Sequence, residues 1–283
     1  MMKPPTITDL DAPSRLYLDL LKRCLTRYAF GETYRLIASR RGSIKWMLYT
    51  PLRKLLNVFQ IELVQLVSFD PYLRAYGRDY PLEAETMIGL QRLDSLQRCI
   101  ADVLRQGVPG DLIETGVWRG GATILMRAVL KIYGETQRVV WVADSFQGVP
   151  KPDSSHYPAD KGDRHWTKPQ LSVSLEQVRA NFRRYNLLDE QVRFLPGWFR
   201  DTLPTAPIER LAILRLDGDL YESTILALRS LYPRLSIGGY VIIDDYGAVA
   251  GCRAAVEDFR TECGVTEEFQ HIDWTGVFWQ RCK

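Results

Sequence analysis

The stretch that decides the fold is "ILRLDGDLYEST", residues 213–224, in which a largely apolar run is followed at once by Asp217 and Asp219. A second stretch, "GGYVIIDDYG" at residues 238–247, repeats this design and places Asp244 and Asp245 after its apolar run. Short, continuous apolar runs are typical of strands that are buried on both faces of a parallel sheet. Both stretches therefore predict a buried strand that ends in a pair of carboxylates.

The rest of the second half alternates between strand and helix patterns. Strands are predicted at residues 111–114, 138–144, 191–197, 211–217 and 240–244. Helices are predicted at 83–107, 121–134, 174–186, 221–235 and 251–264, and a terminal hairpin at 267–281. Alternation of this kind indicates a parallel sheet with helices on both faces. We therefore predict an α/β fold with one seven-stranded, mostly parallel sheet and an antiparallel hairpin at its edge.

Composition excludes several classes of partner. The 283 residues contain 37 basic and 34 acidic side chains, a formal charge of +3, which is too balanced to indicate nucleic acid or an anionic membrane. The five cysteines are widely spaced and include no C-x-x-C pair, so neither a zinc site nor a disulfide framework is indicated. Free thiols are typical of a reducing compartment, and we predict a cytoplasmic protein.

Residues 1–82 are predicted to form a helical N-terminal region that precedes the α/β domain at 83–283. Residues 14–69 have a helical pattern, and 70–82 contain two prolines and a glycine, which favours a linker. The apolar segment 44–69 is interrupted by charges and by Pro51, whereas a transmembrane helix needs about 20 nearly uncharged residues. We expect no transmembrane span and no secretory signal. An amphipathic helix in segment 44–69 is expected to pack on the core or on a partner subunit rather than on a membrane surface, which favours a homo-oligomer.

The carboxyl ends of the predicted strands are unusually acidic. Parallel strands bring such ends to one rim of the sheet, where ligands of open α/β sheets bind. The acids at this rim are Glu114, Asp144, Asp217, Asp219, Asp244 and Asp245. Three of them, Asp217, Asp244 and Asp245, form a plausible carboxylate site for Mg²⁺. The alternative is that these acids only cap helices and lie in solvated loops.

A glycine-rich turn, "IETGVWRGGAT" at residues 113–123, joins the first predicted strand of the domain to a helix. Its glycines lack the G-x-G-x-x-G spacing, which disfavours a nicotinamide dehydrogenase. Asp144 ends the next strand, and an acid at this place can accept both hydroxyls of a ribose. Together these features suit a nucleoside without a diphosphate, such as S-adenosylmethionine.

Five segments together resemble the macrocin O-methyltransferase (TylF-type) family: "YLDLLKRCLTRY", "DLIETGVWRGGA", "VRFLPGWFRDTLP", "LRLDGDLYEST" and "GGYVIIDDYG". The resemblance implies a Rossmann-like class I methyltransferase fold over residues 83–283. It also implies an enzyme that depends on S-adenosylmethionine and Mg²⁺ and methylates a sugar or phenol hydroxyl of a small-molecule natural product.

The resemblance also implies roles for individual residues. Asp217, Asp244 and Asp245 align with the family's metal ligands, and Asp219 aligns with its proposed general base. The cofactor-binding positions are Thr86, Met87, Glu114, Thr115, Gly116, Val117, Trp118, Asp144, Ser145, Gly148, Gly197 and Trp198.

The reaction predicted is an in-line displacement at the sulfonium methyl group, in which Asp219 takes the acceptor's proton. The polar segment 151–169 is predicted to be a lid over the cofactor, and His156 or His165 could assist the base. Two alternatives remain at this stage. One is a metal-independent methyltransferase, and the other is a non-catalytic scaffold that keeps the fold and binds partners through its N-terminal region.

Overall fold

The sheet at the centre of the molecule is doubly wound. The computed structural model describes residues 10–31, 34–37, 42, 44–79 and 81–283. Seven strands form the sheet in the order β5-β4-β3-β6-β7-β9-β8. Their bounds are β3 Asp111–Thr115, β4 Val140–Asp144, β5 Val192–Pro196, β6 Leu211–Leu216, β7 Leu235–Ile243, β8 Gln270–His271 and β9 Val277–Gln280. The first five in this order are parallel, whereas β9 is antiparallel to β7 and to β8. The seven-stranded sheet and its terminal hairpin are as predicted.

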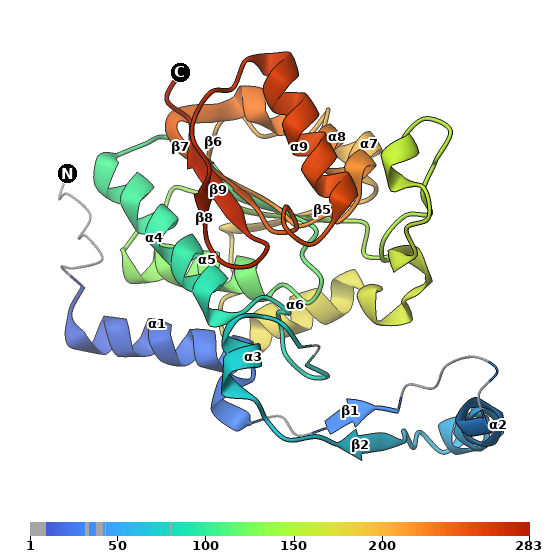
Figure 1. Ribbon diagram of the computed structural model, residues 1–283. Helices are drawn as coiled ribbons and strands as arrows, with labels where there is room; N and C mark the ends of the chain where they lie inside the picture. Colours follow the sequence, from blue (N-terminus) through green and yellow to red (C-terminus); the bar gives the residue numbers. More distant parts are fainter. Residues whose placement is uncertain (1–9, 32–33, 38–41, 43, 80) are drawn as a thin grey trace.

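Helices cover both faces of this sheet (Figure 1). One face carries α1 (Ala12–Leu25), α4 (Leu90–Gln106), α5 (Gly121–Ile132) and α6 (Leu175–Arg184). The other carries α7 (Phe199–Thr202), α8 (Tyr221–Leu231) and α9 (Ala250–Cys263). Short 3₁₀ helices lie at Tyr28–Phe30, Pro158–Asp160, His165–Thr167, Pro169–Leu171 and Tyr232–Arg234. All six residues of β6 are buried, because this central strand is covered from both sides.

The N-terminal region divides into a part that shares the core and a part that leaves it. Leu18, Leu21 and Leu25 of α1 are buried in the same apolar cluster as α4 and α5. The next elements are β1 (Tyr34–Leu36), α2 (Ile44–Val58) and β2 (Val64–Leu66), which we call the arm. The arm extends away from the body (Figure 1), and α3 (Pro71–Ala75) leads back to it. Within the described residues, no helix has the length and apolar character needed to cross a bilayer.

Two sequence predictions need correction here. A helical pattern over 14–69 is wrong at 34–36 and 64–66, where Tyr34 and Leu36 pair with Leu66 and Val64 in an antiparallel ladder. The helix predicted from residue 83 begins at Leu90 instead. Gly89 lies so close to α3 that a Cβ there would be 2.1 Å from the carbonyl oxygen of Ala75, so this segment is held as a tight crossing.

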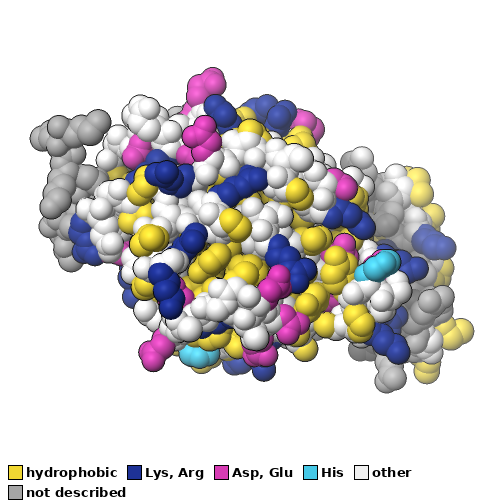
Figure 2. Space-filling model, turned by 90° about the horizontal axis from the view of Figure 1, so that it is seen from above, with side chains coloured by type: hydrophobic (Ala, Val, Ile, Leu, Met, Phe, Trp, Pro, Cys, Tyr) yellow, Lys and Arg dark blue, Asp and Glu magenta, His cyan; other side chains and the backbone are white. Residues whose placement is uncertain are grey.

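The surface agrees with the balanced charge of the sequence. In the face shown in Figure 2, basic and acidic side chains are interspersed around apolar ones, without a broad field of one sign. Such a surface gives no long-range attraction for a polyanion.

Candidate active site

The strand order reverses between β3 and β6, because the chain builds β4 and β5 on one side of β3 and β6 and β7 on the other. Ligands of open α/β sheets bind outside the carboxyl ends of the strands at this reversal. A cavity of about 450 Å³ lies there, lined by residues of both strand ends. Its size is within the usual range for a small-molecule site.

Gly116 joins the two sides of this reversal. It has a φ of +87°, and a Cβ there would be 1.8 Å from the carbonyl oxygen of Asp217. Only glycine fits both the left-handed backbone and this contact. The turn after β3 is therefore packed directly against the end of β6, so Glu114, residues 116–118 and residues 217–219 face the same cavity.

The three predicted metal ligands meet at this rim. Asp217, Asp244 and Asp245 each offer a carboxylate oxygen, and these oxygens lie within 4.8 Å of one another. Asp219 lies beside them, because its backbone N–H donates to Oδ2 of Asp245 at 3.3 Å. Among the described residues, Asp217, Asp244 and Asp245 are the one group of three or more acids, cysteines or histidines whose possible ligand atoms lie close enough together to hold a metal ion.

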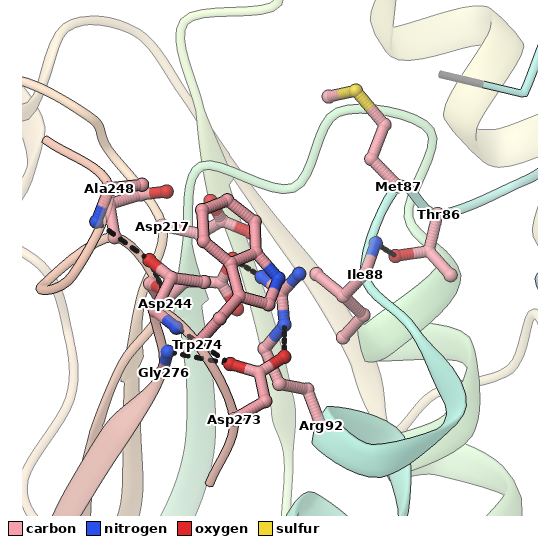
Figure 3. Close-up of polar contacts among 12 residues, drawn as sticks. Thr86, Met87, Ile88, Arg92, Asp217, Asp244, Ala248, Asp273, Trp274 and Gly276 are labelled. Carbon is pink, nitrogen blue, oxygen red and sulfur yellow. Dashed lines mark hydrogen bonds and ion pairs between the residues drawn. The ribbon is translucent and has the colours of Figure 1, made fainter. Parts of the chain in front are cut away.

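Two buried arginines support the acids, and the sequence analysis missed both. Arg215 of β6 is 1% exposed and donates to Glu114, Asp217 and Asp244. Glu114 lies within β3, whereas Asp217 and Asp244 directly follow β6 and β7. Arg92 of α4 donates to the other oxygen of Asp244 (Figure 3). It also forms a 3.0 Å ion pair with Asp273, which precedes β9. An arginine within the apolar run "ILRL" was the available signal, since a buried charge requires partners.

Negative charge at the site remains undercompensated despite the arginines. Burial, followed by the charge of Asp244, raises the pKa of Asp217 to about 7. Burial also raises the pKa of Asp245 well above its ordinary value, and Asp219 and Asp217 add to the effect. A cation placed among these oxygens would offset this repulsion.

The predicted cofactor side is built around two acids. Asp144 accepts backbone N–H groups of Val117 at 2.8 Å and Phe146 at 2.8 Å, which fixes the glycine turn beside the end of β4. Glu114 is 2% exposed and pairs with Arg215 through Oε1, whereas its buried Oε2 has no hydrogen-bond partner within the described chain. Burial raises the pKa of Glu114 to about 8. An unpartnered buried acceptor in a cavity wall indicates a place for a ligand's donor.

Most of the predicted cofactor positions line the cavity. Those that do are Thr86, Met87, Glu114, Gly116, Val117, Trp118, Asp144, Ser145, Gly148 and Trp198. Thr86 and Met87 lie on the opposite side from Asp217 and Asp244 (Figure 3). Thr115 and Gly197 do not line it: Thr115 is buried, and the N–H of Gly197 donates to the carbonyl of Asp144 at 2.9 Å. Thr115 and Gly197 therefore pack behind the residues that line the cavity.

The predicted lid, residues 151–169, belongs to a segment, 151–171, that is held by hydrogen bonds at two points. Asp160 is 2% exposed and accepts the N–H groups of Tyr221 at 2.7 Å and Glu222 at 3.0 Å at the start of α8. Near its other end, Trp118 Nε1 donates to the carbonyl of Gln170 at 2.8 Å. His165 lines the cavity, and its Nδ1 lies 2.7 Å from Oδ2 of Asp163. His156 lies outside the cavity lining.

A model of the macrocin-O-methyltransferase (TylF) family matches residues 14–281 of this sequence. The chain belongs to this family. A 4'-O-methyltransferase of Streptomyces olivaceus is 52% identical over 266 residues, which cover 94% of this chain and 92% of that protein. Its name gives the substrate as 8-demethyl-8-(2,3-dimethoxy-alpha-L-rhamnosyl)-tetracenomycin C. Demethyldecarbamoylnovobiocin O-methyltransferase of Streptomyces niveus is 55% identical over 280 residues, with 98% of both chains covered.

The solved structure of the O-methyltransferase NovP superposes on this family member with a TM-score of 0.82 at 46% identity, and covers 95% of this chain and 100% of that one. The predicted fold is thereby confirmed, and the protein is an O-methyltransferase of the S-adenosylmethionine-dependent type. A purely scaffolding role is not supported for a family member that keeps the complete acidic rim.

Proposed function

We propose that the enzyme methylates a hydroxyl group of a glycosylated or phenolic natural product, with Mg²⁺ bound by Asp217, Asp244 and Asp245. The observation that carries this proposal is the approach of three carboxylate oxygens to within 4.8 Å beside the cavity. Oxygen ligands on a partly open site are what Mg²⁺ prefers. The rhamnosyl group in the name of one relative's substrate supports a sugar hydroxyl as acceptor.

The charge of the three carboxylates suits a divalent cation. The raised pKa values of Asp217 and Asp245 follow from burial and mutual repulsion, so a divalent cation would stabilise both carboxylates. When bound, Mg²⁺ would supply Lewis acidity, which lowers the pKa of an acceptor hydroxyl.

The opposite wall fits the methyl donor. Glu114 presents its unpartnered Oε2 to the cavity, where a cationic amino group is a suitable partner. Asp144 keeps the turn at 117–118 in place and leaves lone pairs for ribose hydroxyls. Thr86 and Met87 would lie against the methionine portion, and Trp198 near the adenine.

In the reaction, Asp219 would take the proton from the acceptor hydroxyl as the new O–C bond forms and the sulfonium S–C bond breaks. Its position is defined by the backbone contact to Asp245, and its side chain faces the cavity. Holding donor and acceptor in line contributes about 7–11 kcal/mol at most. The rigid rim formed by β3, β6 and β7 is suited to this positioning.

A metal-independent reaction is the second candidate, and one observation favours it. Both oxygens of Asp244 already accept hydrogen bonds, one from Arg215 and the other from Arg92. These arginines could balance the rim without an ion, in which case Asp217 and Asp245 would serve only to orient the acceptor.

Calorimetric titration of the metal-free protein with MgCl₂ distinguishes the two candidates. The magnesium proposal predicts one site that disappears in Asp245→Asn but persists in Asp201→Asn, an exposed acid on α7. It also predicts that EDTA abolishes methyl transfer to a rhamnoside and that MgCl₂ restores it. Turnover that is unchanged in EDTA would establish the metal-independent route instead.

A further inference from the structure

Trp274 is an aromatic side chain of the cavity wall to which no role has been assigned so far. It lies in the turn between β8 and β9, is 41% exposed and lines the same cavity as the acidic rim. In Figure 3 its indole overlaps Asp217 and Arg92, which line the same cavity, and Met87 lies on the far side of the view. An indole that is partly exposed within a concave site costs hydrophobic free energy unless a ligand covers it.

The orientation of this indole is fixed from several sides. Its Nε1 donates to the carbonyl of Tyr76 at 2.9 Å. The preceding residue, Asp273, pairs with Arg92, and the hydroxyl of the following residue, Thr275, donates to the carbonyl of Asp244 at 3.0 Å. The platform is therefore tied to the same residues that position a proposed metal ligand.

Arg78 completes this wall. Its guanidinium carbon lies 5.1 Å from the centroid of the Trp274 ring, and both side chains line the cavity. Arg78 is exposed and forms no ion pair with any residue that the structure describes. The pair thus offers an apolar ring surface with hydrogen-bond donors beside it.

We propose that Trp274, with Arg78 beside it, is the platform on which the acceptor's pyranose ring rests, and that this pair determines acceptor specificity. The inference rests on the proposed function. A pyranose has a C–H face that packs on an indole and equatorial oxygens that accept from a guanidinium. Two carboxyl side chains of the cavity lining, Asp79 and Glu222, remain beyond those assigned to the methyl donor, the metal and the base, which suits several hydroxyl donors on one acceptor better than the one or two of a phenol.

The test compares Trp274→Phe and Trp274→Leu with the wild type. Both changes remove the Nε1 donor, but only phenylalanine keeps an aromatic face. The control is Phe30→Leu, because Phe30 is also exposed, at 57%, and lies near a cation, Arg27, yet does not line the cavity. The probes are 4-nitrophenyl α-L-rhamnoside as sugar acceptor and 4-nitrocatechol as phenolic acceptor.

We expect KM for the rhamnoside to rise about 10-fold in Trp274→Leu and about 3-fold in Trp274→Phe, with kcat nearly unchanged. The affinity for S-adenosylhomocysteine should be the same in all variants, and Phe30→Leu should resemble the wild type. A purely structural role would instead change cofactor affinity and affect both Trp274 variants equally. Equal KM values in Trp274→Leu and the wild type would overturn the proposal.

Saturation-transfer NMR separates this inference from the function on which it rests. With the protein saturated with S-adenosylhomocysteine, the sugar C–H protons of the rhamnoside should receive magnetisation in the wild type and lose most of it in Trp274→Leu. Absence of this signal in the wild type would reject the platform even if 4-nitrocatechol were methylated. Failure to methylate either probe, with the NMR signal present, would reject the proposed reaction and leave the platform standing.

Discussion

At the scale of single residues, Asp219 has a backbone that few side chains adopt. Its φ is +57°, and its N–H is held by Asp245. Asparagine tolerates the same left-handed conformation, because its short polar side chain can bond locally. Strained non-glycine residues of this kind cluster at functional sites. The Asp219→Asn change therefore removes the proposed base while keeping its shape.

We predict that Asp219→Asn lowers kcat by about 10²–10⁴-fold, because the amide cannot accept the proton of the acceptor hydroxyl. Binding of S-adenosylhomocysteine, followed by calorimetry, should be unchanged. Asp201→Asn serves as the matched control. Turnover of the Asp219 variant within threefold of the wild type would exclude this residue as the base.

Arg215 is the second residue whose removal should have a clear effect. In Arg215→Met the carboxylates of Glu114, Asp217 and Asp244 lose a shared buried partner. Breaking a buried ion pair on one side costs about 3–5 kcal/mol. Urea unfolding should show a loss of this size at pH 8.

The control for this loss is Arg229→Met, which breaks an exposed pair with Glu262 and should cost under about 1 kcal/mol. If both variants unfold at the same urea concentration, the buried network does not stabilise the rim.

The sequence allowed the acids of the site to be predicted, but not Arg92 and Trp274, which lie beside them in the cavity wall. Each acid follows an apolar strand, so periodicity alone brings Asp217, Asp244 and Asp245 to one rim. Arg92 lies 125 residues before Asp217, on a helix face, and Trp274 lies 57 residues after it, in a hairpin turn. No local pattern relates them to the rim, since only the packing of α4 and of the β8–β9 turn brings them there.

At the scale of elements, the segment 151–171 is joined to α8 through Asp160. This carboxylate occupies the position of a helix cap, although it lies about 60 residues before the helix. The first N–H groups of a helix require such an acceptor, and α8 begins two residues after Asp219. The cap therefore links the segment above the cavity with the loop that carries the proposed base.

We predict that Asp160→Ala releases this segment. The free energy of unfolding should fall by about 1–2 kcal/mol, as expected for a lost cap. Limited proteolysis should cut within residues 151–171 faster, and S-adenosylhomocysteine should protect less than in the wild type.

Asp153→Ala is the control, because the Asp153 carboxylate accepts only from nearby residues of its own turn. Equal cleavage rates for the two variants would show that the cap does not hold the segment.

Helices and strands were predicted well from the sequence where their burial in the fold matches the local pattern of apolar residues. The central strands β3, β4 and β6 are buried along nearly their whole length, so their apolar runs are diagnostic. The arm was misassigned because β1 and β2 are three residues each and pair across a helix, a contact that no short-range pattern contains. The start of α4 was missed because the crossing at Gly89 depends on α3.

At the scale of the whole molecule, the rim makes stability depend on pH. The pKa of Asp217 is raised in the folded protein from 3.8 to about 7. For an acid, a raised folded pKa means that ionisation opposes folding. The cost is absent below 3.8, grows as pH rises towards 7 and is fully present above it.

We therefore predict that the Tm of the metal-free protein falls as pH rises from 5 to 8. MgCl₂ should raise Tm by about 5 °C at pH 8 but hardly at all at pH 5, because protons compete with the ion for the carboxylates there. Differential scanning calorimetry at constant ionic strength measures this. Asp245→Asn should abolish the gain. An equal gain at both pH values would contradict a carboxylate site.

The arm is the other feature of this scale. Exposed apolar side chains on α2 include Ile44, Met47, Leu48, Leu55 and Val58. Their exposure supports the prediction that the N-terminal region mediates a homo-oligomer. We predict that the wild type has the mass of an oligomer in light scattering and that replacing residues 34–66 by a short Gly/Ser linker gives the mass of a monomer, with little change in Tm.

Removing residues 10–25 is the contrasting change. It takes Leu18, Leu21 and Leu25 out of the core, so cooperative unfolding should be lost. An arm-deleted protein that keeps its oligomeric mass would place the interface elsewhere.

The close approach at Gly116 has a consequence for how this scaffold can diversify. Since the backbone there meets that of residue 217 with no room for a methyl group, neither half of the rim can shift without the other. New acceptors must then be accommodated by parts outside this backbone contact, such as the turn that carries Trp274 and the stretch around Arg78. Variation among enzymes of this design should accordingly concentrate at those two loops, while the rim itself changes little.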